Sequence, residues 1–304
     1  WQQEMSTSAA DAEQAHPVTR PRPGHADLAG CLKFNQRDAR NILERASARE
    51  TAIRVAVGAV CKALLQSFSI TIFSYVISIG IHELKPEIFQ KDDAQLALLA
   101  EGSPFRVPDP LLEEKLKEAV DKAKREGDSL GGRFRIISRG LPPGIGSHIQ
   151  YDLKLDGRLA QAVMSIQAIK GVEIGLGFKA AQTPGSQVHD EIGYEHSRGF
   201  YHLSNNAGGI EGGISNGEDI IVTAAMKPIP TLYRPLQSVD LISKQPFQAS
   251  VERSDTCAVP AAAVVGEAVV AIEIARLLME KFGGDFIEET TAHYQKYLDH
   301  LSSF

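Results

Sequence analysis

The chain has 304 residues, of which 43% are hydrophobic and 23% charged, and its formal net charge is -6. This is the composition of an ordinary globular protein, and the acidic balance argues against general nucleic-acid binding, which favours a basic surface. Only 7% of the residues are aromatic, which also disfavours a stacking surface for single strands.

Cysteine usage and hydropathy bear on where the protein works. Cys31, Cys61 and Cys257 show neither CxxC pairing nor metal-ligand spacing, and an odd number argues against a disulfide framework. We therefore expect a reducing, cytoplasmic location. No apolar run reaches the roughly 18 residues that a membrane span needs. Residues 1–18 are expected to be a loose polar end without a secretory signal.

A loop, a long helix and a strand are expected first. Residues 20–30, RPRPGHADLAG, contain two prolines and a glycine, so we expect a stiff loop that presents His25, and neither a helix nor a strand. The alternative is a turn whose histidine only faces water. Residues 38–68 carry apolar residues at helical spacing, with a break near 46–49. Residues 69–80 are rich in β-branched and aromatic residues, which predicts a strand.

The middle of the chain alternates between helices and strands. We expect an amphipathic helix over residues 111–128 that Gly127 closes, a strand over 133–140, and a helix over 154–169. Residues 170–217 are dense in glycine. They are expected to form irregular tight turns, or backbone that approaches a ligand closely.

The last third begins with a strand over residues 219–226, which leads into the rigid loop KPIPT at 227–231. Two short strands around a turn are expected within 238–253. An apolar helix within 257–284 then ends at Gly283. This order of elements predicts an α+β protein.

Arginine is concentrated near the N-terminal side. Seven arginines and four acidic residues fall between positions 20 and 54, and guanidinium groups bind phosphate and carboxylate in a bidentate way. An anion site and a solvated helix face are both open readings. Arg45, Ser47 and Arg49 could converge only at a loop or a helix start. Arg45 and Arg253 each precede a helix rich in small residues, an echo that suits a pseudo-symmetric core.

Several well-marked catalytic motifs are absent from the sequence. It has no GxGxxG after a strand, no P-loop, no HExxH and no GxSxG. We therefore expect no metal site. Four histidines in loop-like sequence are expected at the surface: His148, His189, His196 and His202.

Eight segments together resemble the bacterial form of the chorismate synthase family. They are RPRPGHADL, LERASARETAIRVAVGAV, GDSLGG, SIQAIKGVEIGLGF, GSQVHDEI, NNAGGIEGGISNG, MKPIPTL and ERSDTCAVPAA. They run from about Thr19 to about Gly284 in the family order, nearly the whole chain. The resemblance implies one domain over residues 1–304 with a β-α-β sandwich fold, in which antiparallel sheets lie between helices.

The resemblance also implies an activity. The family converts 5-enolpyruvylshikimate 3-phosphate into chorismate by a 1,4-elimination of phosphate, a lyase step of the shikimate pathway that requires reduced FMN. NADPH as the reductant, an external flavin reductase and a homotetramer are further expectations from the family.

Site residues follow from the same resemblance. His25 is expected to act as a proton donor at the flavin, Asp255 to help a flavin nitrogen accept the substrate's proton, and Arg49 to contact the substrate's anionic groups. The expected FMN-binding residues are Arg45, Ala46, Ser47, Gln167, Ala168, Gly212, Lys227, Pro228, Ile229, Pro230, Thr231 and Arg253.

One motif of the family has no counterpart here. The family's N-terminal segment contains TxGESHG with a second histidine, and the sequence lacks it. An inactive fragment that binds FMN or anions is therefore the alternative to an active enzyme.

Overall fold

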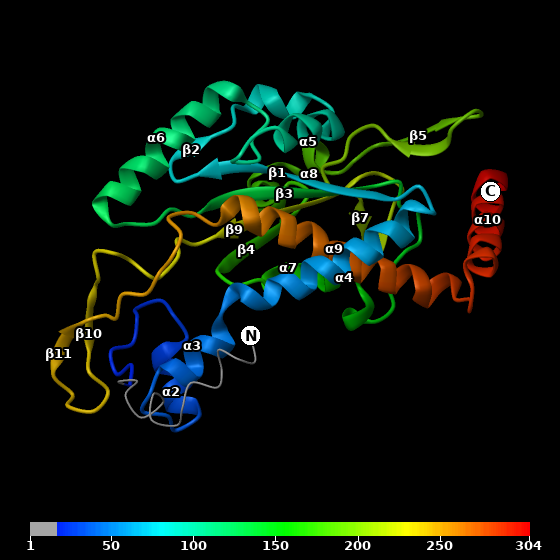
Figure 1. Cartoon of the computed structure of the whole chain (residues 1–304). Coiled ribbons are helices and arrows are strands. Elements are labelled where there is room, and N and C mark those ends of the chain that lie inside the picture. Colours follow the sequence, from blue (N-terminus) through cyan, green and yellow to red (C-terminus); the bar gives the residue numbers. More distant parts are fainter. Residues whose placement is uncertain (1–16) are drawn as a thin grey trace. The chain divides into compact units, whose positions relative to one another are not determined.

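The computed structural model describes residues 17–304, whose contacts form two compact units (Figure 1). The smaller unit joins the N-terminal segment up to Arg49 with Lys122–Ser129 and Ile229–Thr256, and the larger unit holds the remainder. One domain over residues 1–304 stays a prediction. Most of the end expected to be loose, residues 1–16, lies outside the described residues, and Val18 donates its amide to Asp38 Oδ1 at 2.9 Å.

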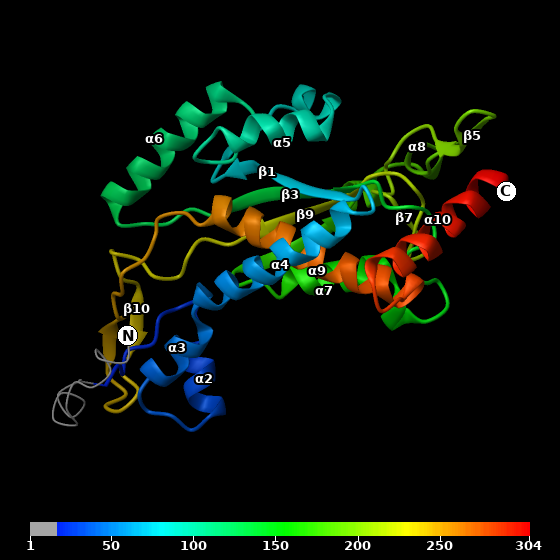
Figure 2. The same ribbon diagram turned by 45° about the vertical axis from the view of Figure 1, so that its right-hand side comes forward.

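A five-stranded antiparallel sheet forms the centre of the larger unit, in the order β2-β1-β3-β9-β4. Helices lie on both faces, with α4, α7 and α9 on one and α5 and α6 on the other (Figure 1 and Figure 2). This arrangement confirms the predicted α+β fold with an antiparallel sheet between helices. The strands are β1 (Thr71–Ile79), β2 (His82–Glu83), β3 (Gly132–Arg139), β4 (Ile169–Ile174) and β9 (Ile220–Met226), and the helices are α4 (Thr51–Gln66), α5 (Asp93–Glu101), α6 (Pro110–Glu126), α7 (Leu155–Met164) and α9 (Val259–Phe282).

The sheet is covered on both faces, and the burial of β1 reflects this. In β1 every residue from Ser74 to Ile79 is buried, so the strand lacks the polar–apolar alternation of a half-exposed sheet. The buried Ser74 hydroxyl donates to Glu267 of α9 at 2.6 Å. Glu267 also forms ion pairs with Arg106 and Lys62, so this buried carboxylate is compensated.

Small residues let α4 and α9 lie close together. A Cβ added at Gly58 would lie 2.4 Å from the Ala268 Cβ, a distance that real atoms do not reach. The apolar residues at helical spacing on this helix do not form its buried face, because Ile53, Val57 and Val60 are exposed. The buried residues of α4 are Gly58 and Leu65. Helices α4 and α9 are the two helices rich in small residues that the echo in the sequence precedes. They contact each other directly in the larger unit.

Two sequence expectations in the middle of the chain were wrong. The helix predicted over 154–169 ends at Met164, because Ala168 has φ of +66°, which an α-helix does not contain. The glycine-rich stretch begins within a strand, β4, at the edge of the main sheet, whose pairing with β9 shifts register between Ile169 and Gly171. Strand β4 forms its backbone hydrogen bonds with β9. The glycine-containing sequence of β4 does not by itself predict this pairing.

Helices that the sequence analysis did not predict also occur. Helix α2 (Asp27–Lys33) begins inside the stretch expected to be loop, and α10 (Ile287–Ser303) follows the last predicted helix. Helix α10 is polar and buries only Thr290 and Tyr294, so its apolar periodicity is weak. Further short elements of the larger unit are η3 (Pro86–Gln90), η4 (Tyr151–Leu153), η5 (Gly177–Gln182), α8 (Gly185–Val188), β5 (Ile192–Glu195), β6 (Gly199–His202), β7 (Ile210–Glu211) and β8 (Ile214–Ser215).

The smaller unit has its own small core. Cys31, Ala39 and Ile42 are buried together, and Val18 and Leu241 pack against them. Its other elements are α3 (Arg40–Ala46) and a hairpin of β10 (Gln237–Val239) and β11 (Pro246–Gln248), while η2 (Ala48–Glu50) spans the boundary of the two units. The hairpin and the break between α3 and α4 confirm the sequence predictions.

The contact at Gly58 predicts opposite effects for two glycine-to-alanine substitutions. Alanine is the better helix former by about 1 kcal/mol, and Gly157 of α7 has no atom within 3.8 Å of an added Cβ. We expect Gly157→Ala to raise the unfolding free energy slightly. We expect Gly58→Ala to lower it by about 1–3 kcal/mol, because the added methyl overpacks the α4–α9 contact. Urea titration followed by circular dichroism measures both, and equal effects would contradict the packing argument.

Candidate functional site

A tight turn places His25. The His25 amide donates to the Arg22 carbonyl at 3.2 Å, across Pro23 and Gly24. Gly24 has φ of +77°, the left-handed conformation that a type II turn requires at its third position, with proline favoured at the second. The loop expected at this point is therefore present up to the start of α2. His25 does not simply face water, because its side chain is only 18% exposed.

A buried carboxylate holds the imidazole ring of His25. Asp27, at the start of α2, is 1% exposed, and its Oδ1 lies 2.5 Å from His25 Nδ1. Burial by itself would raise the pKa of Asp27, but hydrogen bonds from His25 and Arg22 outweigh burial and hold that pKa well below its usual value. Asp27 is therefore ionised throughout the neutral range.

Arg22 joins this pair to the KPIPT loop. It is 6% exposed, and its Nε donates to Asp27 Oδ2 at 2.8 Å while its Nη1 donates to Thr231 Oγ1 at 2.8 Å. Its Nη2 lies 3.1 Å from Nδ1 and 3.3 Å from Nε2 of His25. Arg22 thus connects His25 with Thr231. The resemblance implies site roles for His25 and Thr231 but not for Arg22.

The break between α3 and α4 holds the arginine-containing segment of the smaller unit. Helix α3 ends at Ala46, and Ser47 is extended, with φ of -65° and ψ of 136°. The Ser47 hydroxyl accepts a hydrogen bond from the Arg49 amide at 3.3 Å. Arg49 pairs with Glu44 at 3.2 Å, with 82% of its side chain exposed. Arg45 is also exposed, so both guanidinium groups are accessible to an anion.

A second group of expected residues comes together in the larger unit. The Lys227 amide donates to the Ala168 carbonyl at 2.9 Å, so the end of β9 adjoins the start of β4. The Gln167 amide nitrogen donates to Glu50 at 2.6 Å, while its Oε1 is buried with no hydrogen-bond partner. Burial and the nearby Lys170 charge lower the pKa of Lys227, so a bound anion would stabilise its charged form.

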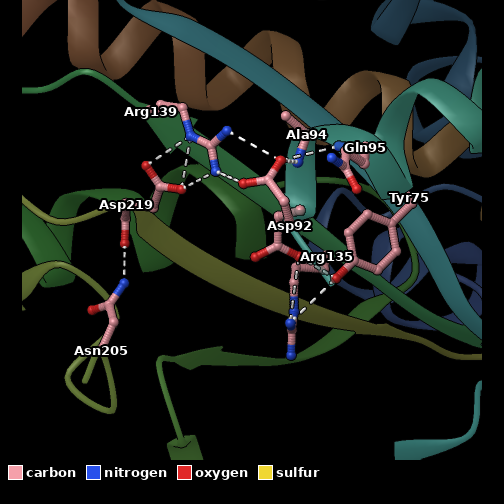
Figure 3. Close-up of polar contacts among 9 residues, drawn as sticks. Tyr75, Asp92, Ala94, Gln95, Arg135, Arg139, Asn205 and Asp219 are labelled. Carbon is pink, nitrogen blue, oxygen red and sulfur yellow. Dashed lines mark hydrogen bonds and ion pairs between the residues drawn. The ribbon is translucent and has the colours of Figure 1, made fainter. Parts of the chain in front are cut away.

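Gly212 lies in a glycine-rich loop that polar contacts fix in place. In Figure 3, Arg139 at the end of β3 bonds to both Asp92 and Asp219, and Asn205 bonds to the Asp219 carbonyl. Gly212 itself forms the turn between β7 and β8, with φ of +60°, and an added Cβ would meet only His148, at 3.9 Å. Its exposed side therefore leaves room for a ligand.

The remaining expected residues lie in extended or loop segments. Arg253 and Asp255 are exposed and precede α9, in a segment where the Ser254 carbonyl accepts a hydrogen bond from Tyr233 at 3.4 Å. Pro228 is exposed, and the Ile229 carbonyl accepts from Ser129 at 2.7 Å.

The histidines expected at the surface are placed there with one exception. His148, His189 and His196 are exposed. His202 is only 10% exposed, and its Nε2 lies 2.9 Å from Glu211. The prediction was wrong for His202 because the β5–β6 hairpin carries its side chain towards the glycine-rich loop.

Three polar residues that hold the expected ones were not found from the sequence. Arg22 and Asp27 contact His25, and Glu50 contacts Gln167. A usable signal existed for the first two, because an RPGH turn followed two residues later by aspartate at a helix start places arginine, histidine and carboxylate near one another. Glu50 gave no such signal, since its partner lies 117 residues away.

The polar groups of the larger unit suit an organic anion. The half-buried Lys227 ammonium can bind an anionic group, and the unpartnered Gln167 Oε1 can accept from an N–H donor of the ligand. Within residues 17–304 no group of three or more His, Cys, Asp or Glu is arranged to hold a metal. Over the same residues no helix has the length and hydropathy needed to cross a membrane.

Comparisons with known proteins agree with one another. A family model described as chorismate synthase matches residues 2–279. The chorismate synthase of Geobacter sulfurreducens is 57% identical, with 100% of this chain and 79% of that protein covered. That of Aquifex aeolicus is 54% identical, with 100% and 78% covered. A crystal structure of chorismate synthase has 51% identity and a TM-score of 0.80, and covers 92% of this chain and 77% of that one.

The burial and ionisation of Asp27 predict that the structure around α2 becomes less stable in acid. Its pKa in the folded state lies below the ordinary value of 3.8. Its ionisation therefore stabilises the fold above about pH 4, and this contribution is lost as the pH falls further. Hydrogen-exchange protection of the α2 amides should drop between about pH 5 and about pH 3.

Asp27→Asn should show weaker protection at the higher pH and a smaller drop on acidification. Asp38→Asn serves as the matched control, since Asp38 caps backbone amides of Val18 and Arg40. An unchanged acid-dependent drop in Asp27→Asn would contradict the assignment.

Proposed function

The chain belongs to the chorismate synthase family, and from that premise we propose how its residues carry out the reaction. The enzyme is a lyase of the shikimate pathway that eliminates phosphate from 5-enolpyruvylshikimate 3-phosphate to form chorismate, and the reaction requires a reduced flavin. The observation that carries this function is identity of 57% across the whole chain. It favours an enzyme over a binding fragment without chemistry.

FMN is the flavin in this proposal, with NADPH as the reductant and an external flavin reductase as the source of the reduced form. When bound, reduced FMN supplies the electron density that assists the departure of phosphate. The unpartnered Gln167 Oε1 supports a site for a ligand with N–H donors. The burial of Lys227 supports an anionic group beside it.

The FMN-binding residues of this proposal are those that the resemblance implies. They are Arg45, Ala46, Ser47, Gln167, Ala168, Gly212, Lys227, Pro228, Ile229, Pro230, Thr231 and Arg253. Arg49 would bind an anionic group of the substrate, which its exposed guanidinium supports.

Proton transfer is assigned to His25 and Asp255. Because Nδ1 of His25 is engaged by Asp27, Nε2 is the atom from which the imidazole would give a proton. The exposed Asp255 carboxylate would assist transfer of the ring proton removed from the substrate. The hydrogen-bonded turn around His25 supports this role, since a proton donor must be held in one orientation.

A homotetramer in a reducing cytoplasm completes the proposal. Exposed apolar side chains on α4, such as Ile53 at 66% and Val60 at 71%, support burial of this helix face against further protein. Cys31, Cys61 and Cys257 are free thiols in the structure, as expected for a reducing compartment.

The proposed role of His25 predicts a loss of turnover without a loss of cofactor. With reduced FMN under anaerobic conditions, the protein should release phosphate from 5-enolpyruvylshikimate 3-phosphate. His25→Ala should lower kcat by about 10²-fold or more, because a proton donor acts in the transition state, while the FMN dissociation constant changes little. Phosphate release and a flavin absorbance titration measure the two quantities. Exposed His196→Ala is the control, and equal losses of turnover and FMN binding would contradict the role.

A further inference from the structure

The Asp27 carboxylate lies at the centre of a buried hydrogen-bond network whose pattern assigns a proton. Its Oδ2 accepts from the Arg22 amide at 3.1 Å and from Arg22 Nε at 2.8 Å. Its Oδ1 accepts from Arg22 Nη2 at 3.1 Å and lies 2.5 Å from His25 Nδ1. An ionised carboxylate can only accept hydrogen bonds, so the hydrogen between Asp27 and His25 belongs to Nδ1.

The proton on Nδ1 determines what the other ring nitrogen does. In neutral imidazole one nitrogen donates and the other accepts, so Nε2 of His25 is the nitrogen that gains and loses the exchangeable proton. Arg22 Nη2, which can only donate, lies 3.1 Å from Nδ1 and 3.3 Å from Nε2. A nitrogen almost equidistant from the two ring nitrogens lies over the ring face, so the Arg22 guanidinium stacks on the imidazole and fixes its plane.

The same guanidinium reaches a second segment of the site. Arg22 Nη1 donates to Thr231 Oγ1 at 2.8 Å, and Thr231 is buried. A planar group with donors on several edges can bind Asp27 and Thr231 and at the same time stack on the His25 ring, which the single ammonium of a lysine cannot do. The orientation of His25 is thus linked to the position of the KPIPT loop.

We propose that Arg22 and Asp27 are positioning residues for the reaction: they hold His25 as the Nδ1–H tautomer, direct Nε2 to proton transfer, and tie it to Thr231. This inference rests on the proposed function of His25. It adds two residues that act through the imidazole and do not themselves contact the reacting atoms.

The first test measures the tautomer directly and needs no activity. With 15N-histidine in the full chain, two-bond nitrogen–proton correlations recorded over a range of pH distinguish the two neutral tautomers from each other and from the imidazolium. We expect Nδ1–H for His25 in the wild type. An Nε2–H tautomer in the wild type would overturn the inference, even if His25→Ala is inactive.

Asp27→Asn should exchange the tautomer. The Asn oxygen is expected at the Oδ2 position, where Arg22 supplies two donors, which leaves the amide nitrogen facing His25 Nδ1. That nitrogen would donate to Nδ1 and so require Nε2–H. Asp38→Asn is the matched control, because Asp38 accepts hydrogen bonds from backbone amides only. Its His25 tautomer should stay that of the wild type.

The second test separates positioning from structural support by kinetics. Asp27→Asn should lower kcat by about 10²-fold or more, as for a histidine held in the wrong tautomer, with little change in KM or in FMN affinity. Arg22→Lys should lower kcat less, and Thr231→Val less again. Near-wild-type kcat in a folded Asp27→Asn with the exchanged tautomer would refute the inference.

Failure of the inference and failure of the proposed function give different results. Full activity in His25→Ala would reject the function assigned to His25 and leave the tautomer measurement intact. If Asp27→Asn does not fold, the wild-type tautomer and the kinetics of Thr231→Val still decide the matter. In that case, an Nε2–H wild type, or a Thr231→Val variant that keeps full kcat, would count against the inference.

Discussion

The pairing of β9 with its neighbours decides where the candidate binding residues of the larger unit lie. Met226, the last residue of β9, pairs with Gly132 of β3 on one side and with Ile169 of β4 on the other. Lys227 therefore leaves the sheet directly beside Ala168, to which it is hydrogen bonded. A shift of register by one residue would turn each side chain of β9 to the opposite face. Because both faces are buried, the core itself maintains this arrangement.

The smaller unit positions its residues by a different means. Among its described residues the strands are those of one hairpin, β10 and β11, and its core of Cys31, Ala39 and Ile42 is small. Here a proline–glycine turn and a buried ion pair between Arg22 and Asp27 provide the rigidity. Such a pair is costly to break, because removal of one partner leaves an uncompensated buried charge. Stability and the orientation of His25 therefore depend on the same contacts.

The exposure of the candidate arginine and lysine side chains suits the binding of anionic groups. Arg45, Arg49 and Arg253 are exposed, and Arg49 is paired with Glu44, whereas Lys227 is half-buried and close to Lys170. A phosphate or carboxylate bound at Lys227 would relieve both the burial and the repulsion.

The sequence by itself determined the features that depend on close neighbours along the chain. Proline and glycine define the turn before His25, β-branched residues define β1, and small apolar residues define α9. Resemblance to a family selected the site residues. Only the tertiary structure decided the rest. The contact of Arg22 with Thr231 spans 209 residues, and that of Gln167 with Glu50 spans 117. Strand β4, with its internal glycine, forms only because β9 pairs with it. Such partners are brought together by the packing of distant segments, and no local pattern of residues encodes that packing.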